Sequence, residues 1–109
     1  MNLIQLKEKV NKGIELGAQV VYIKEESLLF GIEKILKNEE NKSIVLVKSK
    51  GESLKSEDFI NIIDEIYNHI GDVEVFIGKD NKYRNEDKSI EFVEFAQYED
   101  IKMLFLNSN

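Results

Sequence analysis

The residues from Ser56 to Ile77 carry a helical and then an extended hydrophobic pattern, one directly after the other. Apolar side chains recur first at three- and four-residue spacing, which places them on one face of an α-helix. Ser56 is a favourable N-cap residue, and Glu57 and Asp58 put negative charge at the positive end of the helix dipole. Gly71 is suited to end the helix, and apolar residues then alternate at period two. The apolar helical face consists of Phe59, Ile62, Ile63, Ile66, Tyr67 and Ile70.

A shorter amphipathic pattern at the start of the chain predicts another helix, from about Leu3 to Leu16. Asn2 is a suitable cap for its first turn, Gly13 weakens its last turn, and Gly17 ends it. The apolar face of this helix consists of Leu3, Leu6, Val10 and Ile14.

Three strands are predicted to follow the first helix. Residues 19–24 and 28–36 are rich in β-branched, aromatic and aliphatic residues, and Gly31 marks a bulge or a close approach in the second of them. Residues 43–48 form a nearly continuous apolar run, which favours a strand covered on both faces. The polar stretch 49–55 is expected to be a linker.

The second half is predicted to repeat the order of the first. After the second helix and its strand come an eleven-residue charged loop at 78–88, a strand at 89–95 and a last strand that runs to Leu106. The expected fold is α+β, with two helices packed on a mainly antiparallel sheet of about six strands in the order α-β-β-β-α-β-β-β.

An internal duplication would explain this order within one domain of residues 1–109. The proposed pseudo-repeats are residues 1–48 and 56–107, and the sequence leaves open whether patterning this short arose by chance. In the helices, the matched positions are Leu3, Leu6, Val10 and Ile14 with Phe59, Ile62, Ile66 and Ile70. In the strands they are Gly17, Val21, Tyr22 and Ile23 with Gly71, Val75, Phe76 and Ile77, Ile32, Glu33 and Ile35 with Ile90, Glu91 and Val93, and the apolar run 44–47 with 101–106.

Composition narrows the function classes. A formal charge of -6 argues against binding to nucleic acid, because phosphate neutralisation needs clustered Lys and Arg. The chain has no cysteine, which excludes disulfides and thiolate sites. We find no signal peptide or membrane span in the pattern, so we expect a cytoplasmic protein without membrane contact.

No arrangement of residues indicates catalysis. His69 is the only histidine and is predicted to complement the negative end of the helix dipole. Asp58, Asp64 and Glu65 are expected on the solvated face of the second helix rather than as a catalytic pair. The 78–88 loop fails the EF-hand and phosphate-loop spacings. We therefore expect no enzyme activity, no metal and no cofactor.

The charged loop supplies the predicted partner-binding residues. Long loops in small domains are often functional, and Tyr and Arg are enriched at interface hot spots. The alternative is that a Tyr-Arg pair in a hairpin is simply exposed. The predicted contact residues are Lys79, Asp80, Tyr83, Arg84, Glu86 and Asp87.

Aromatic residues near the end of the chain are predicted to lie in the core. Phe92 and Phe95 are three residues apart, so in a regular strand they point to opposite faces. One of the two then needs cover from the helices or from another copy of the chain. The aromatic residues concerned are Phe92, Phe95, Tyr98 and Phe105.

Residues 53–95 combine a short capped helix, the sequence GDVEVFIG and a charged hairpin. In this combination the chain resembles small acidic accessory proteins of phages and mobile elements. Some of those proteins inhibit host defence systems, as anti-CRISPR proteins do, and others resemble toxin-immunity partners. The resemblance implies a small inhibitor of a larger protein and carries over no functional residue.

The preferred functional hypothesis is a protein-binding or inhibitor module, encoded by a phage or mobile element and acting on a host defence protein with a basic surface. One alternative is a homo-oligomer that binds a small ligand at a subunit interface. Another is a toxin-immunity protein.

Overall fold

The computed structural model describes residues 1–51, 53–79 and 87–108. It confirms the predicted α+β class and adds a seventh, two-residue strand inside the stretch predicted to be a linker. Of that stretch, Ser49 belongs to the preceding strand. The elements are α1 (Leu3–Glu15), β1 (Val20–Glu25), β2 (Leu28–Asn38), β3 (Ser43–Ser49), β4 (Leu54–Lys55), α2 (Ser56–Ile70), β5 (Glu74–Gly78), β6 (Lys88–Tyr98) and β7 (Ile101–Ser108).

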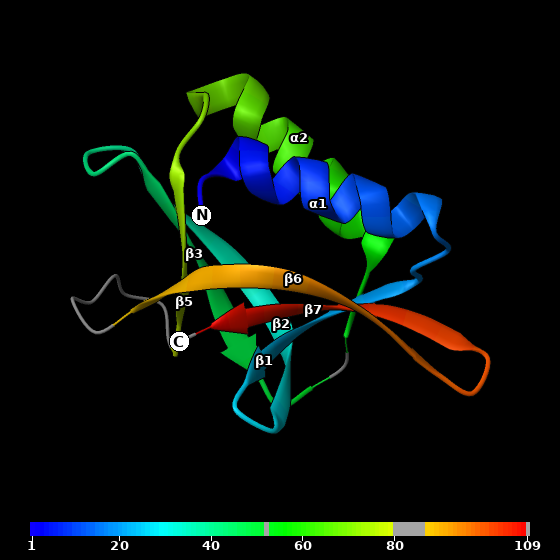
Figure 1. The fold of residues 1–109 in the computed structure, drawn as a ribbon. Helices are drawn as coiled ribbons and strands as arrows, with labels where there is room; N and C mark the ends of the chain where they lie inside the picture. The colour runs from blue at the N-terminus through cyan, green and yellow to red at the C-terminus, as the bar shows by residue number, and fades with distance from the viewer. Residues whose placement is uncertain (52, 80–86, 109) are drawn as a thin grey trace.

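The strands form one strongly curved sheet in the order β2-β3-β5-β6-β7-β1-β4. Because β2 also pairs with β1, the pairings of the six longer strands close into a ring. The pairings β3–β5 and β1–β7 are parallel, and the others are antiparallel. Both helices lie side by side on one side of this sheet (Figure 1).

The two halves of the chain pair in the same way. Each contributes three successive strands in antiparallel order, and each parallel pairing joins the last strand of one half to the first strand of the other. The long middle strands also carry a bulge at matched places, since the register shifts at Glu33 in β2 and at Glu91 in β6. The bulge expected near Gly31 therefore lies two residues later. Duplication stays a prediction, and these repeated pairings support it.

The predicted match between the residues of the two helices agrees only in part with the residues that are buried. The fully buried positions of the two helices share one spacing, but Phe59 corresponds to Leu6 rather than to Leu3. The sheet covers only part of the apolar face of each helix. The buried residues therefore differ from those matched by apolar spacing alone. The buried residues are Leu3, Leu6, Val10 and Gly13 in α1 and Ser56, Phe59, Ile63 and Ile66 in α2.

The predicted N-cap role of Ser56 is wrong. Ser56 is the first residue of α2, Lys55 occupies the cap position, and no side chain caps this end. The backbone N–H of Ser56 donates to the carbonyl of Gln19 at 2.9 Å, because β4 pairs with β1 immediately before the helix. This pairing draws Ser56 into the core and removes its hydroxyl from the capping position.

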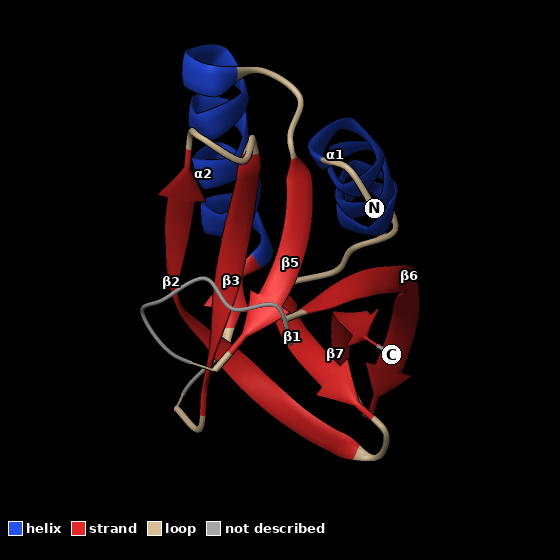
Figure 2. Cartoon of the chain, turned by 90° about the vertical axis from the view of Figure 1, so that its left-hand side faces the viewer, coloured by secondary structure: helices blue, strands red, loops and turns tan. Residues whose placement is uncertain are grey.

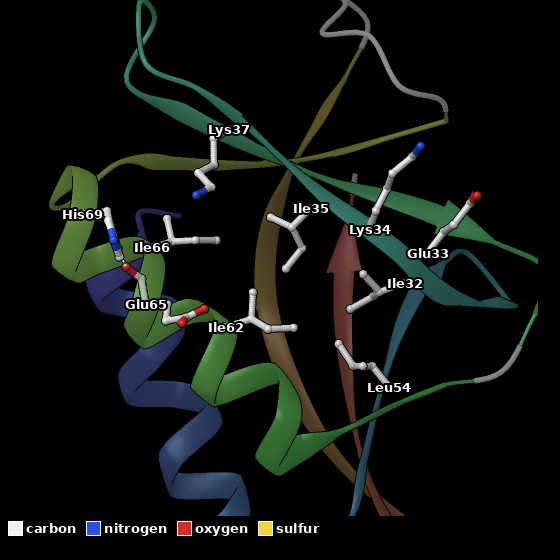
Figure 3. A pocket seen from close by; sticks show the side chains of 10 residues that line it. All are labelled: Ile32, Glu33, Lys34, Ile35, Lys37, Leu54, Ile62, Glu65, Ile66 and His69. Carbon is white, nitrogen blue, oxygen red and sulfur yellow. Dashed lines mark hydrogen bonds between the residues drawn. The ribbon is translucent and has the colours of Figure 1, made fainter.

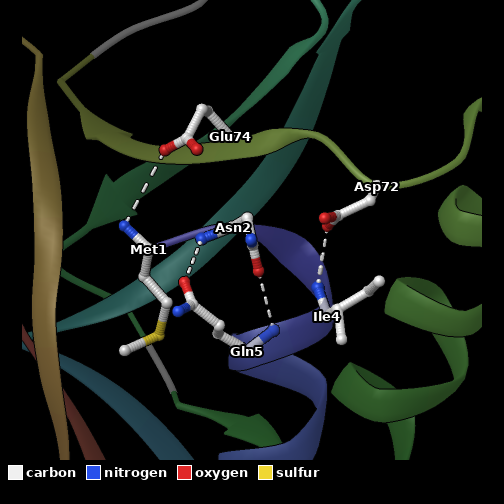
Figure 4. Close-up of polar contacts among 6 residues, drawn as sticks. All are labelled: Met1, Asn2, Ile4, Gln5, Asp72 and Glu74. Carbon is white, nitrogen blue, oxygen red and sulfur yellow. Dashed lines mark hydrogen bonds and ion pairs between the residues drawn. The ribbon is translucent and has the colours of Figure 1, made fainter.

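The start of α1 is held as predicted, by a capping box. Asn2 accepts a hydrogen bond from the N–H of Gln5 at 2.9 Å, and the Gln5 side chain accepts from the N–H of Asn2 at 3.0 Å (Figure 4). Asp72 accepts from the N–H of Ile4 at 3.0 Å and so ties the loop before β5 to the same turn. The first helical turn is therefore fixed to the end of α2.

One hydrophobic core lies between the helices and the sheet. Gly13 brings α1 close to β7, because a Cβ atom at that position would lie 2.3 Å from Leu104 Cδ2. The helices also meet through a 2.8 Å ion pair between Lys7 and Asp64, so Asp64 does not simply face water as predicted. None of the helices among the described residues is long and apolar enough to cross a membrane.

The prediction that the late aromatic residues lie in the core is wrong for three of the four. Phe92 is 51% exposed, Phe95 38% and Tyr98 71%, whereas Phe105 is half-buried. The helices cover only one face of β6 and β7, and Phe92 and Tyr98 lie on the other. Phe95 pairs with Leu104 on the helix side but is only partly covered, so Phe92 and Phe95 do point to opposite faces. The expectation for β3 is confirmed, since residues 43–47 are buried on both faces.

Candidate functional site

The predicted loop site is only partly within the described residues. Asp80, Tyr83, Arg84 and Glu86 lie outside them. Lys79 and Asp87 lie at the two ends of the loop and line one cavity of about 280 Å³, which they share with Glu25, Lys48, Ile77, Gly78 and Lys88. The structure thus brings two of the six predicted residues together.

Glu25 is the electrostatic centre of this cavity. Its carboxylate pairs with Lys48, and its second oxygen lies 3.5 Å from Lys88 Nζ. Burial acts to raise the pKa of Glu25, but the hydrogen bond and charge of Lys48 and the charge of Lys88 outweigh it and lower that pKa below its ordinary value. These two ion pairs connect Glu25 of β1 to Lys48 of β3 and to Lys88 at the start of β6.

A second candidate surface lies on the side of β1, β6 and β7 that faces away from the helices. Directly paired residues share a face, and Leu104 and Leu106 point toward the helices. The alternate residues of these strands therefore point outward, and they include Tyr98 paired with Ile101. We call this surface the open face and define it by Tyr22, Phe92, Tyr98, Ile101, Met103 and Phe105.

The middle of the open face is ordered by polar and aromatic contacts. The rings of Tyr22 and Phe105 meet edge to face, with centroids 6.2 Å apart. Lys24 Nζ lies 5.3 Å from the Phe105 ring centroid and 3.5 Å from a carboxylate oxygen of Glu94. Asn107 donates to the same Glu94 oxygen at 3.4 Å. This region is thus a fixed platform with its charges paired.

The rim of the open face is different in character. At the β6–β7 turn, Tyr98 is 71% and Ile101 49% exposed, and Glu99 and Asp100 stand between them. Neither acidic side chain has an ion pair within the described parts of the chain. The turn therefore presents an aromatic and an aliphatic side chain beside two uncompensated negative charges.

The open face was missed in the sequence although its signal is present. A strand with one solvated face should carry polar residues at alternate positions, yet of positions 92, 94, 96 and 98 of β6 only Glu94 is charged, and the others are Phe, Ala and Tyr. Aromatic residues on a strand predict a place in the core. An exposed apolar sheet face gives the same pattern, and only the position of the helices distinguishes the two.

A third site is a groove between β2 and α2 with a cavity of about 270 Å³ (Figure 3). Its floor consists of Ile32, Ile35, Leu54, Ile62 and Ile66. Lys37 points from β2 toward α2, whereas the side chains of Glu33 and Lys34 point away from the helix.

His69 stands on the α2 side of this groove. Its Nδ1 lies 2.7 Å from the carbonyl oxygen of Glu65, so this nitrogen carries the proton and donates. The other ring nitrogen has no hydrogen-bond partner within the described residues. His69 is in the last turn of α2, as predicted. Within the described residues, no group of three His, Cys, Asp or Glu side chains is placed to hold a metal ion.

Comparisons with known proteins identify no relative. No family model, no curated protein and no solved structure matches the chain. We therefore infer the function from the geometry of these three sites.

Proposed function

We propose that this protein is a non-catalytic protein-binding module and that the open face is its contact surface. The observation that carries the proposal is the exposure of Phe92, Tyr98 and Ile101 together on one side of β6 and β7. Exposed apolar side chains gathered on one face mark interaction sites in soluble proteins, and aromatic residues dominate binding energy at interfaces.

The charges beside the open face favour a basic partner. Glu99 and Asp100 are exposed at its rim, and the whole chain carries a formal charge of -6. A partner with an apolar patch bordered by Lys or Arg would cover Tyr98 and Ile101 and compensate both carboxylates. This charge distribution agrees with the partner expected from the sequence.

A narrower role follows only from the resemblance of residues 53–95. In that form of the proposal, the chain is encoded by a phage or mobile element and inhibits a host defence protein. A toxin-immunity protein would use the same surface. The partner's identity distinguishes the two.

A second candidate function is self-association through the open face, with a small ligand held between subunits. The exposed apolar side chains favour it equally, but the turn would bring Glu99 and Asp100 of one copy near a like-charged neighbour in many arrangements. Light scattering after size-exclusion chromatography separates the two candidates. A monomer at micromolar concentration favours the hetero-partner, and a tight dimer favours self-association.

The proposal is tested by quantitative affinity capture with paired variants. Phe92→Ser with Tyr98→Ser removes the two most exposed aromatic side chains of the open face while leaving the core intact. We expect the double variant to bind the partner with at least tenfold lower affinity, at about 1.4 kcal/mol per tenfold. Leu16→Ser is the matched control, since Leu16 is exposed at the end of α1, away from this face. Equal capture by the double variant and the wild type would overturn the open face as the contact surface.

The predicted loop residues are tested in the same experiment. We expect Tyr83→Ala with Arg84→Ala to leave the melting temperature nearly unchanged and to weaken binding if the loop borders the interface. Unchanged binding by this variant would remove the loop from the contact surface without affecting the proposal for the open face.

A further inference from the structure

Among the described residues, the edge of β2 that faces α2 has no strand partner over most of its length. On one edge β2 pairs with β3 from Gly31 to Asn38, but on the other it pairs with β1 only from Leu28 to Phe30. β2 carries a bulge at Glu33, three residues beyond its last pairing with β1, and a bulge bends the strand that contains it. Backbone donors and acceptors beyond Ile32 are therefore free to pair with an added strand.

This free edge borders the groove rather than open solvent. The cavity is lined on one side by successive β2 residues and on the other by Ile62, Glu65, Ile66 and His69 of α2 (Figure 3). Its floor is apolar, so an extended segment that pairs with β2 would place alternate side chains on buried aliphatic surface. A volume of about 270 Å³ suits one or two such side chains.

One end of the groove carries a positive charge that suits an anionic ligand group. Lys37 has no ion pair or hydrogen bond within the described chain, and its ammonium group points toward α2 near His69. The opposite charges nearby are Glu65, one helical turn before His69, and Glu39, which lines a neighbouring cavity with His69. A carboxylate at the Lys37 end would meet an unpaired cation, and Glu65 would repel negative side chains further along the groove.

We propose that the groove between β2 and α2 binds the C-terminal end of an extended peptide. The peptide adds as a parallel strand to the free edge of β2, because this direction places its terminal carboxylate at Lys37 and His69. Its last apolar side chain packs on Ile35 and Ile66. This second site does not depend on the open face, and the two proposals can fail separately.

The proposal specifies the ligand. Preferred peptides have a free C-terminus, aliphatic residues at alternate positions, and no Asp or Glu among the last residues, where Glu65 would oppose them. Amidation of the C-terminus should weaken binding by about tenfold, the loss of one charge-assisted contact.

The test uses random eight-residue peptides displayed with free C-termini and selected on the full chain. Enriched peptides are then synthesised and measured against the wild type, Lys37→Glu and Lys34→Glu. Lys34 is the matched control, because it neighbours the groove on the same strand but points away from α2. Both side chains are exposed, so neither variant threatens the fold.

We expect enriched peptides to lose about tenfold or more in affinity on Lys37→Glu and to change less than about twofold on Lys34→Glu. Peptide binding should slow amide hydrogen exchange at residues 32–38. The proposal is overturned if no peptide is enriched over the Lys37→Glu protein, if amidated peptides bind equally well, or if protection appears on β6 and β7 instead. Protection of 32–38 by self-association alone, or equal binding of free leucine, would also overturn it.

Discussion

At the residue scale, the role of an acidic side chain depends on which groups it contacts as well as on its residue type. Glu25 is one of 21 acidic residues, yet its side chain is only 16% exposed and lies between two lysines. Asp58 and Glu65 are exposed, as expected for a solvated helix face. What separates Glu25 from these residues is its place where three strands meet.

Glu25→Gln should lower stability at neutral pH by about 1 kcal/mol, a typical value for a partly exposed ion pair. Because the pKa of Glu25 is lowered on folding, its contribution is complete above its ordinary pKa and is lost as the pH falls through the lowered value. Urea unfolding between pH 7 and pH 3 should therefore show the wild type converging on the variant. Glu26→Gln, at the exposed neighbouring position, is the control, and parallel pH profiles for wild type and Glu25→Gln would contradict the assignment.

At the element scale, the two helices follow the same pattern but meet the sheet differently. In α1 the fourth buried position is Gly13, which permits direct contact with β7. The corresponding position of α2 is Ile66, whose side chain lines the groove beside β2. The glycine of α1 thus lies where that helix contacts the sheet directly. The isoleucine of α2 lies beside an open groove.

Gly13→Ala tests this contact. Alanine favours helix over glycine by about 1 kcal/mol, but its Cβ would lie 2.3 Å from Leu104 Cδ2 in a fully buried layer. Overpacking of a core costs about 1 to 3 kcal/mol, so we expect a net loss of stability. Asn11→Ala, on the exposed side of α1, is the matched control and should be neutral or stabilising. A higher thermal midpoint for Gly13→Ala would show that α1 does not need this close approach.

At the scale of the whole molecule, the halves depend on one another. Each parallel pairing joins a strand of one half to a strand of the other, and both helices share one core. The sequence correctly predicts two helical stripes and a repeated order, but each half taken alone would expose the edges and faces that the other covers.

We therefore expect fragments 1–50 and 53–109 to lack a cooperative thermal transition when separate, because each loses its parallel partners and about half of the core. Mixing them in equal amounts should restore part of the far-ultraviolet circular dichroism signal of the intact chain. A cooperative transition in either fragment alone would instead identify an independently stable half.

Periodicity by itself determined the two helices and the six longer strands of this protein. Helix and strand positions follow from local spacing, capping and glycine placement, which act over a few residues and can be recognised in sequence. The α1 boundary at Leu3, the buried β3 run and the positive φ of Gly17 and Gly71 are all of this local kind.

Only the tertiary structure decided which apolar surface is covered. Phe92 and Tyr98 follow the same hydrophobic pattern as core residues, but the helices occupy one face of the sheet and leave the other open. The parallel pairings, the short β4 strand and the groove beside β2 likewise depend on contacts between residues far apart in the chain. Burial is a property of the whole packing arrangement, so a local pattern indicates that a face is apolar but not what covers it.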